Sequence, residues 1–231
     1  MGGRGTFVGR AAVRSVRLNE VHPVHPSLDP LPVQGGEETG SGYAKWDEAV
    51  TAPVPEAAVA GAVGAARAHL RIAGSGEDAV LARLAGAALA LGEAFTGAAL
   101  IVRAHEDLVP AGGAWTPLRA EPVRSVAGVT ALPAGGAPFV LAADAYEVDL
   151  DARGCGRVRV APVAGIARAA VGYQAGLAAD WDALPAPIAQ GTVLLIAHLF
   201  DERNGRGAAP PAAVTALWRP WRRIALDRRR A

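Results

Sequence analysis

The chain has 231 residues, enough for one good hydrophobic core or for a core with an appendage. It carries 23 Lys plus Arg against 22 Asp plus Glu, so no overall charge indicates a nucleic-acid binder. Lys45 is the only lysine, and the abundance of Ala, Gly and Arg is typical of a GC-rich coding sequence, which lowers the weight of any Arg cluster. The single cysteine, Cys155, excludes an internal disulfide framework and a multi-cysteine zinc site.

Residues 1–52 contain the tract HPVHPSLDPLPVQGGEETGSG, in which Pro and Gly recur too often for a helix or a central strand. We interpret them as a flexible N-terminal extension that is dispensable for folding. His22 and His25 lie in this tract without a carboxylate or thiol at a ligand spacing, so a solvated loop is favoured over a metal site.

A helical hairpin is predicted next, with helices over residues 55–70 and 76–96. Pro55 suits the opening turn of the first helix, Ser75 is a candidate N-cap of the second, and Gly97 is a natural C-terminal stop. The predicted apolar stripe of the second helix consists of Leu81, Leu84, Ala88, Leu91 and Phe95. This stripe requires burial against another element.

Beyond Gly97 the pattern changes to short segments rich in Val, Leu, Tyr and Phe, which predict strands. The predicted strands cover residues 100–108, 123–132, 139–150 and 156–163, with a shorter one at 169–173. Turn residues over 151–156 separate two alternating segments and predict an antiparallel hairpin there.

A second helical part follows. Pro187 begins a helix that runs to a stop at Asn204 and Gly205, and because its apolar residues lie nearly all round, it is expected to be central. The charge-free run 191–200 is about half of what a bilayer requires, so no membrane partner is expected. Past a Gly/Pro break, residues 212–226 predict a last helix, interrupted or kinked at Pro220.

These elements indicate an α+β fold with a helical hairpin, a central helix, an inserted antiparallel β region and a C-terminal helical arm. The predicted division is an extension (1–52), a body (53–204, with the β region at about 100–173) and an arm (205–231).

The sequence contains no phosphate-binding loop, no G-x-S-x-G elbow and no G-x-G-x-x-G after a strand. Cys155 stands between two glycines without a flanking His, which favours a small turn residue over a reactive thiolate. We therefore assign no catalytic, cofactor-binding or metal-binding residue and predict that the protein is not an enzyme.

The C-terminal arm holds the one candidate site, a partner-binding group made of Trp218, Arg219, Trp221, Arg222 and Arg223. Large aromatics and Arg are the residue types that anchor protein interfaces. The alternative is that the tryptophans fold onto the protein's own core and the arginines form a solvated tail. Chemistry alone favours neither interpretation.

Several segments, taken in order, resemble the head-tail connector (adaptor) proteins of long-tailed phages and of the gene transfer agents of alphaproteobacteria. The opening helices carry AHLRI, Glu77-Asp78, Leu81, Ala88, Glu93, Thr96-Gly97 and Leu100. The segment PAPIAQGTVLLIAHLFDERN is similar to the penultimate helix of that family, and EPVRSV with YEVDLD to its β-insertion. The likeness covers about residues 55–226, whereas residues 1–52 have no counterpart in it.

The resemblance implies a ring under the portal, with residues 212–226 reaching the portal and the body receiving a tail-side connector or terminator protein. It also implies a self-assembling ring in a virion or phage-like particle assembled in the bacterial cytoplasm, with DNA passing through the lumen without sequence-specific contact and no cofactor. A second hypothesis is a small nucleic-acid-binding or packaging protein that uses the Arg-rich tail.

Overall fold

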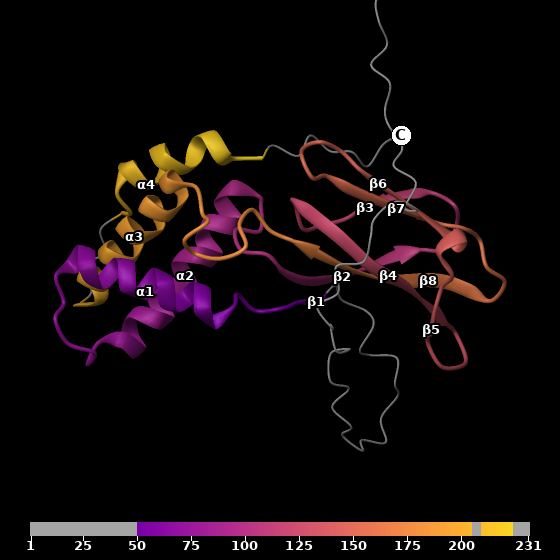
Figure 1. The fold of residues 1–231 in the computed structure, drawn as a ribbon, viewed down its shortest axis with the longest axis horizontal. Coiled ribbons are helices and arrows are strands. Elements are labelled where there is room, and N and C mark those ends of the chain that lie inside the picture. The colour runs from indigo at the N-terminus through magenta and orange to yellow at the C-terminus, as the bar shows by residue number, and fades with distance from the viewer. Residues whose placement is uncertain (1–49, 205–208, 224–231) are drawn as a thin grey trace, which may run out of the picture. The chain divides into compact units, whose positions relative to one another are not determined.

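The computed structural model describes residues 50–204 and 209–223 (Figure 1). Within these residues, four α-helices and two antiparallel sheets confirm the α+β class. The predicted N-terminal extension lies outside the described residues except for its end, where Val50–Thr51 forms β1 and pairs with the next strand of the fold. Residues 50–51 are therefore part of the folded structure.

The predicted helical hairpin is present as α1 (Glu56–Leu70) and α2 (Asp78–Thr96). Helix α2 ends at Gly97 with φ 69°, in the left-handed conformation that favours glycine, as expected. Its start differs from the prediction, because Glu77 occupies the N-cap position. Ser75 lies two residues before this N-cap, and its backbone carbonyl accepts a hydrogen bond from the N–H of Asp78 at 3.1 Å.

The buried face of α2 is rotated away from the predicted stripe. Leu91 is 51% exposed, and Leu84 and Phe95 are only partly buried. Leu81 and Ala88 of the predicted stripe are buried, and the other buried positions are Ala85, Leu89, Gly92 and Thr96. Small side chains at several of these positions allow close approach of the neighbouring helices, so an alanine- and glycine-rich face is buried in preference to a face with larger residues.

By length and composition alone, α2 could also cross a bilayer. A third of its most apolar 18-residue stretch is buried inside this structure. Core helices of soluble proteins pass the same test. In the structure α2 packs against α1 and against α3 (Ala186–Asp201).

Helix α3 is central, as predicted. It contacts α1, α2 and α4 (Ala212–Trp218), and Pro187 lies in its first turn. Ile188 and Ile196 are fully buried on it. Glu202–Asn204 extends α3 by a 3-10 turn, so the chain leaves the helix where the sequence predicted.

The strands form two antiparallel sheets (Figure 1). The larger has the order β1-β2-β8-β4-β5, and its members are β2 (Arg103–Pro110), β8 (Ile166–Ala175), β4 (Val123–Pro133) and β5 (Phe139–Val140) in addition to β1. The smaller has the order β3-β7-β6, with β3 (Trp115–Pro117), β7 (Gly156–Val160) and β6 (Tyr146–Leu150). The predicted hairpin is confirmed as β6 and β7.

Two strand predictions need correction. Residues 139–150 are not one strand, because a 3-10 turn at Ala143–Ala145 separates β5 in one sheet from β6 in the other. The segment predicted as a short strand at 169–173 is the middle of β8, the central strand of the larger sheet. Its Ala and Gly residues have low strand propensity, which weakens the local signal in the sequence. Hydrogen bonding to β2 on one side and β4 on the other stabilises the strand despite this low propensity.

The fold holds two hydrophobic clusters. One is helical and includes Leu81, Leu89 and Ile196. The other fills the space between the two sheets and includes Val129, Val158 and Val171.

Candidate partner-binding site

The C-terminal segment is anchored by Trp218, which is 3% exposed. Its indole Nε1 donates a hydrogen bond to the carbonyl of Ile188 at 3.2 Å, and its ring centroid lies 5.9 Å from that of Phe95. A Cβ atom at Gly191 would lie 2.3 Å from the same Nε1. Helix α4 therefore approaches α3 closely because Gly191 has no side chain.

The sequence left open whether the two tryptophans pack on the protein's own core or meet a partner. Trp218 is buried by the protein's own helical core, and Trp221 is partly buried against the same core. The two rings separate because α4 ends at Trp218 and Arg219–Trp221 forms a 3-10 turn that contains Pro220.

The three arginines of the group have different environments. Arg219 and Arg222 are exposed, and the guanidinium of Arg222 lies 5.8 Å from the ring centroid of Phe95. Arg223 is partly buried and binds inward, with Nη1 donating to Glu121 at 2.9 Å. The sequence placed these residues in one group, but the structure divides them. Trp218 and Arg223 bind the body, whereas Arg219 and Arg222 face solvent.

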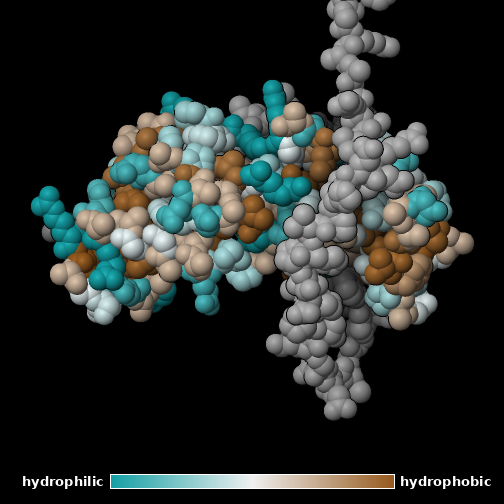
Figure 2. All heavy atoms as spheres, in the orientation of Figure 1, coloured by the Kyte–Doolittle hydropathy of each residue, from teal (hydrophilic) through white to brown (hydrophobic). Residues whose placement is uncertain are grey.

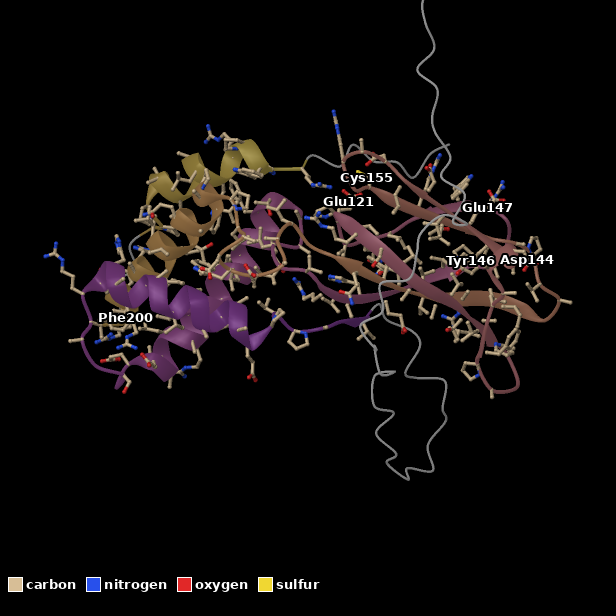
Figure 3. All side chains as sticks on the ribbon, viewed as in Figure 1. Glu121, Asp144, Tyr146, Glu147, Cys155 and Phe200 are labelled. Carbon is tan, nitrogen blue, oxygen red and sulfur yellow. The ribbon has the colours of Figure 1, made fainter. Side chains whose placement is uncertain are left out.

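Arg223 joins three parts of the chain. Its backbone N–H donates to the carbonyl of Thr96 at 2.7 Å, and its Nη2 donates to the carbonyl of Arg153 at 2.7 Å. Glu121, which it pairs with, also accepts from Cys155 Sγ at 3.4 Å; Figure 3 shows the two labelled side chains near each other. Cys155 lies in the turn between β6 and β7, as predicted for a small turn residue.

A second ion pair joins α2 to β2. The two terminal nitrogens of the Arg103 guanidinium, Nη1 and Nη2, donate to the carboxylate of Glu93 at 2.7 Å and 2.8 Å. Glu93 Oε1 also accepts a hydrogen bond from the N–H of Leu100 at 2.8 Å. Arg103 Nε donates to the carbonyl of Ala52 at 3.0 Å. The side chains are 9% and 18% exposed, so this bidentate pair is a structural brace between helix and sheet.

The larger sheet contains a buried polar cluster that the sequence did not reveal. Asp107 Oδ2 accepts from the Tyr173 hydroxyl at 2.9 Å and from the N–H of Arg119 at 2.7 Å, and the same hydroxyl accepts the N–H of Ala120 at 2.9 Å. Burial raises the pKa of Tyr173 far above its ordinary value. The hydroxyl therefore stays protonated and holds the segment before β4 against the sheet.

His105 stacks on Tyr173 with ring centroids 5.5 Å apart, and its Nδ1 lies 3.2 Å from the hydroxyl of Thr51 on β1. Burial lowers the pKa of His105, and the nearby Arg103 adds to the effect. A neutral, buried imidazole that stacks on Tyr173 and hydrogen-bonds to Thr51 acts as a structural residue.

A pocket of about 260 Å³ lies at the smaller sheet. Its polar wall contains Asp144, Tyr146, Glu147 and Arg159, and Figure 3 labels the first three of these. Glu147 and Arg159 pair with each other across the two strands of the β6–β7 hairpin. Within residues 50–204 and 209–223, no three His, Cys, Asp or Glu side chains gather as a metal site requires; His22 and His25 lie outside these residues.

Comparison with solved structures identifies the relatives of this fold. The chain is similar to a protein in the neck of an empty gene transfer agent particle computed with C6 symmetry, at a TM-score of 0.62 and 28% identity over 76% of this chain and 96% of that chain. A chain in the virion of a native gene transfer agent particle matches with a TM-score of 0.62 and 30% identity, over 76% of this chain and 95% of that chain. A chain in the neck of a native gene transfer agent particle computed with C12 symmetry matches with a TM-score of 0.60 and 28% identity, over 76% of this chain and 96% of that chain. No family model matches the chain, and no curated protein matches its sequence.

The similarity to these neck and virion chains defines the class: a structural, non-enzymatic component of a phage-like particle. The chain belongs to the family of gene transfer agent particle proteins that includes neck components.

Proposed function

We propose that the protein is the head-tail connector, or adaptor, of its particle. It forms a homo-oligomeric ring between the portal and a tail-side connector or terminator protein. DNA passes through the lumen without sequence-specific contact, and the ring is assembled in the bacterial cytoplasm. In this proposal the body (53–204) forms the ring and the arm (205–231) meets the portal.

The observation that carries the portal contact is the division of the C-terminal segment. Trp218 and Arg223 hold the segment against the body, while Arg219 and Arg222 are directed to solvent. Exposed cations on an anchored segment lose little conformational freedom when they bind, because the backbone that carries them is already ordered. Residues 224–231, with three more arginines, continue directly from this point.

The test is co-sedimentation of the full chain with purified portal rings from the same particle. Arg219→Ala with Arg222→Ala is expected to weaken portal binding at least about tenfold, because two charged contacts are removed. Arg71→Ala with Arg83→Ala is the matched control, since both arginines are exposed but lie on the helical hairpin. The control is expected to bind portal as the wild type does.

A protein that does not bind portal rings at all contradicts the proposal. Binding to duplex DNA that disappears at moderate salt, together with no affinity for the portal, would instead favour the packaging hypothesis. Each outcome is read in the same sedimentation experiment with portal or DNA as the partner.

A further inference from the structure

The pocket at the smaller sheet lies where β6 begins, after the 3-10 turn Ala143–Ala145, and where β7 ends. Its volume of about 260 Å³ is below the roughly 300–1,000 Å³ that sites for drug-sized ligands occupy. The pocket therefore suits a single side chain of another protein better than a molecule of cofactor size.

Small residues and backbone hydrogen bonds form the walls of this pocket. Gly113 has a φ of 78°, in the left-handed conformation that favours glycine, and a Cβ added there would lie 3.6 Å from Cδ of Pro162. The N–H of Gly113 donates to the carbonyl of Val160 at 2.9 Å, and the N–H of Ala161 donates to the carbonyl of Ala145 at 2.9 Å. These bonds fix the walls to β7, so the pocket is formed before any partner binds.

The polar wall of the pocket carries one negative charge that no cation compensates. Arg159 is already engaged, because its guanidinium pairs with Glu147 and lies 5.2 Å from the ring centroid of Trp115. Asp144 is exposed, and its side chain has no hydrogen bond or ion pair with any residue that the structure describes (Figure 3). The hydroxyl of Tyr146 is equally without a partner among these residues. The wall therefore holds two carboxylates and one guanidinium, which leaves one net negative charge beside an aromatic ring.

The rim of the pocket is exposed and uncharged. It consists of lining residues and their neighbours in the chain: Gly112, Ala114, Ala143, Ala161 and Pro162. Figure 2 shows mainly hydrophobic residues, with a few hydrophilic ones among them, at the end of the molecule opposite the helices. A partner that rests on such a rim excludes water from the charge in the pocket, which strengthens a charge-assisted hydrogen bond there. Anchor pockets of protein interfaces have this organisation, with one large side chain inserted and surrounding contacts that exclude water.

We propose that this pocket binds an arginine side chain presented by a partner protein. The guanidinium of the partner donates to the carboxylate of Asp144 and stacks on the ring of Tyr146. Charge complementarity selects a cation, and arginine is favoured over lysine because its planar guanidinium both donates in pairs to a carboxylate and stacks on an aromatic ring. The same charge disfavours an anionic partner such as DNA. The inference does not depend on the proposed ring.

The test is saturation-transfer difference NMR, which observes the signals of a small probe and tolerates a protein assembly of any size. The probe is the peptide acetyl-Gly-Arg-Gly-amide, and the matched neutral probe carries citrulline in place of arginine. The full wild-type chain is expected to bind the arginine peptide at least about tenfold more tightly than the citrulline peptide, because the neutral side chain cannot form the charge-assisted hydrogen bond.

Asp144→Asn removes the charge and keeps the shape of the side chain, so it is expected to weaken binding of the arginine peptide at least about tenfold. Its melting temperature is expected to stay within about a degree of the wild type, because this exposed side chain has no partner in the described part of the chain. Asp182→Asn is the matched control, since Asp182 is also exposed but lies before α3, outside the pocket. The control is expected to bind the arginine peptide as the wild type does.

Several outcomes overturn this assignment. No detectable binding of the arginine peptide, or equal binding of the arginine and citrulline peptides, does so with the wild type alone. Unchanged binding by Asp144→Asn, or an equal loss in Asp182→Asn, does so as well. Spermidine that binds more tightly than the peptide, with the same dependence on Asp144, identifies a soluble polyamine as the ligand and overturns the assignment to a protein side chain. The portal co-sedimentation is a separate measurement, so failure of this site is distinguishable from failure of the ring.

Discussion

The indole of Trp218 lies directly against Gly191, so that a Cβ atom at position 191 would lie 2.3 Å from the indole nitrogen. Gly92 on α2 faces the same ring, with a distance of 3.5 Å from its ideal Cβ to the six-membered part of the indole. Trp218 thus fills a space that two helical glycines leave open. This packing joins the C-terminal helix to the body and explains why the ring is buried without a partner.

Substitution of Gly191 tests this packing. We expect Gly191→Ala to lower the free energy of unfolding by about 1–3 kcal/mol, because the methyl group displaces a packed ring. Gly86→Ala on α2 is the control, since its added methyl would contact nothing. The control is expected to stabilise by about 0.5–1 kcal/mol through helix propensity. Equal stability of the two variants in a urea titration would show that α4 does not pack on α3 as described.

Trp218→Ala is expected to destabilise the protein by about 3–5 kcal/mol, from lost burial and an unfilled cavity. Trp221→Ala is expected to cost less, because that side chain is only partly buried. If Trp218→Ala loses portal binding but keeps the wild-type free energy of unfolding, the indole side chain contacts the portal and does not stabilise the core.

The Glu93–Arg103 pair gives a third prediction. Arg103→Ala leaves a mostly buried carboxylate without its partner and is expected to cost up to about 3–5 kcal/mol. Arg157→Ala removes an exposed pair with Asp149 and is expected to cost less than about 1 kcal/mol. A double-mutant cycle with Glu93→Gln measures the coupling. Coupling no larger than that of the exposed pair would argue against the brace.

His105 predicts a pH dependence of stability. Because burial lowers its folded-state pKa, the unfolded chain binds the proton first as the pH falls. Its contribution to stability is therefore unchanged above the ordinary pKa of about 6.5 and decreases as the pH falls below that value. Arg103, Asp107 and Glu93 are the charged groups that influence it.

We expect the melting temperature of the wild type to fall between about pH 7.5 and about pH 5 by more than that of His105→Gln. The neutral amide cannot take up the proton, so the variant keeps only the pH dependence of the other groups. Identical slopes for the two proteins would exclude His105 as the source.

The N-terminal segment gives the last prediction. Removal of residues 1–49, with β1 retained, is expected to leave the thermal transition almost unchanged, because the Pro/Gly-rich tract lacks the apolar periodicity of a packed element. Removal of residues 1–51 also deletes the hydrogen bond between Thr51 and His105 and is expected to lower stability further. A chain starting at residue 50 that aggregates would contradict this division.

The sequence by itself determined the elements whose signals are local. Gly97 ends α2, Pro187 lies in the first turn of α3, and Pro220 interrupts the last helix, because each residue restricts the backbone at its own position. The β6–β7 hairpin is equally local, since its turn and both alternating strands are contiguous in the chain.

Only the tertiary structure decided which faces are buried and which distant residues meet. Helix α2 is apolar nearly all round, so its periodicity does not define its rotation, and packing against α1 and α3 leaves Leu91 exposed. Asp107 and Tyr173 are 66 residues apart, and Glu121 and Arg223 are 102 apart. Such contacts depend on how the elements cross, and local propensity holds no information on that crossing. The same reason placed Trp218 in the core, where the sequence had left core and interface equally open.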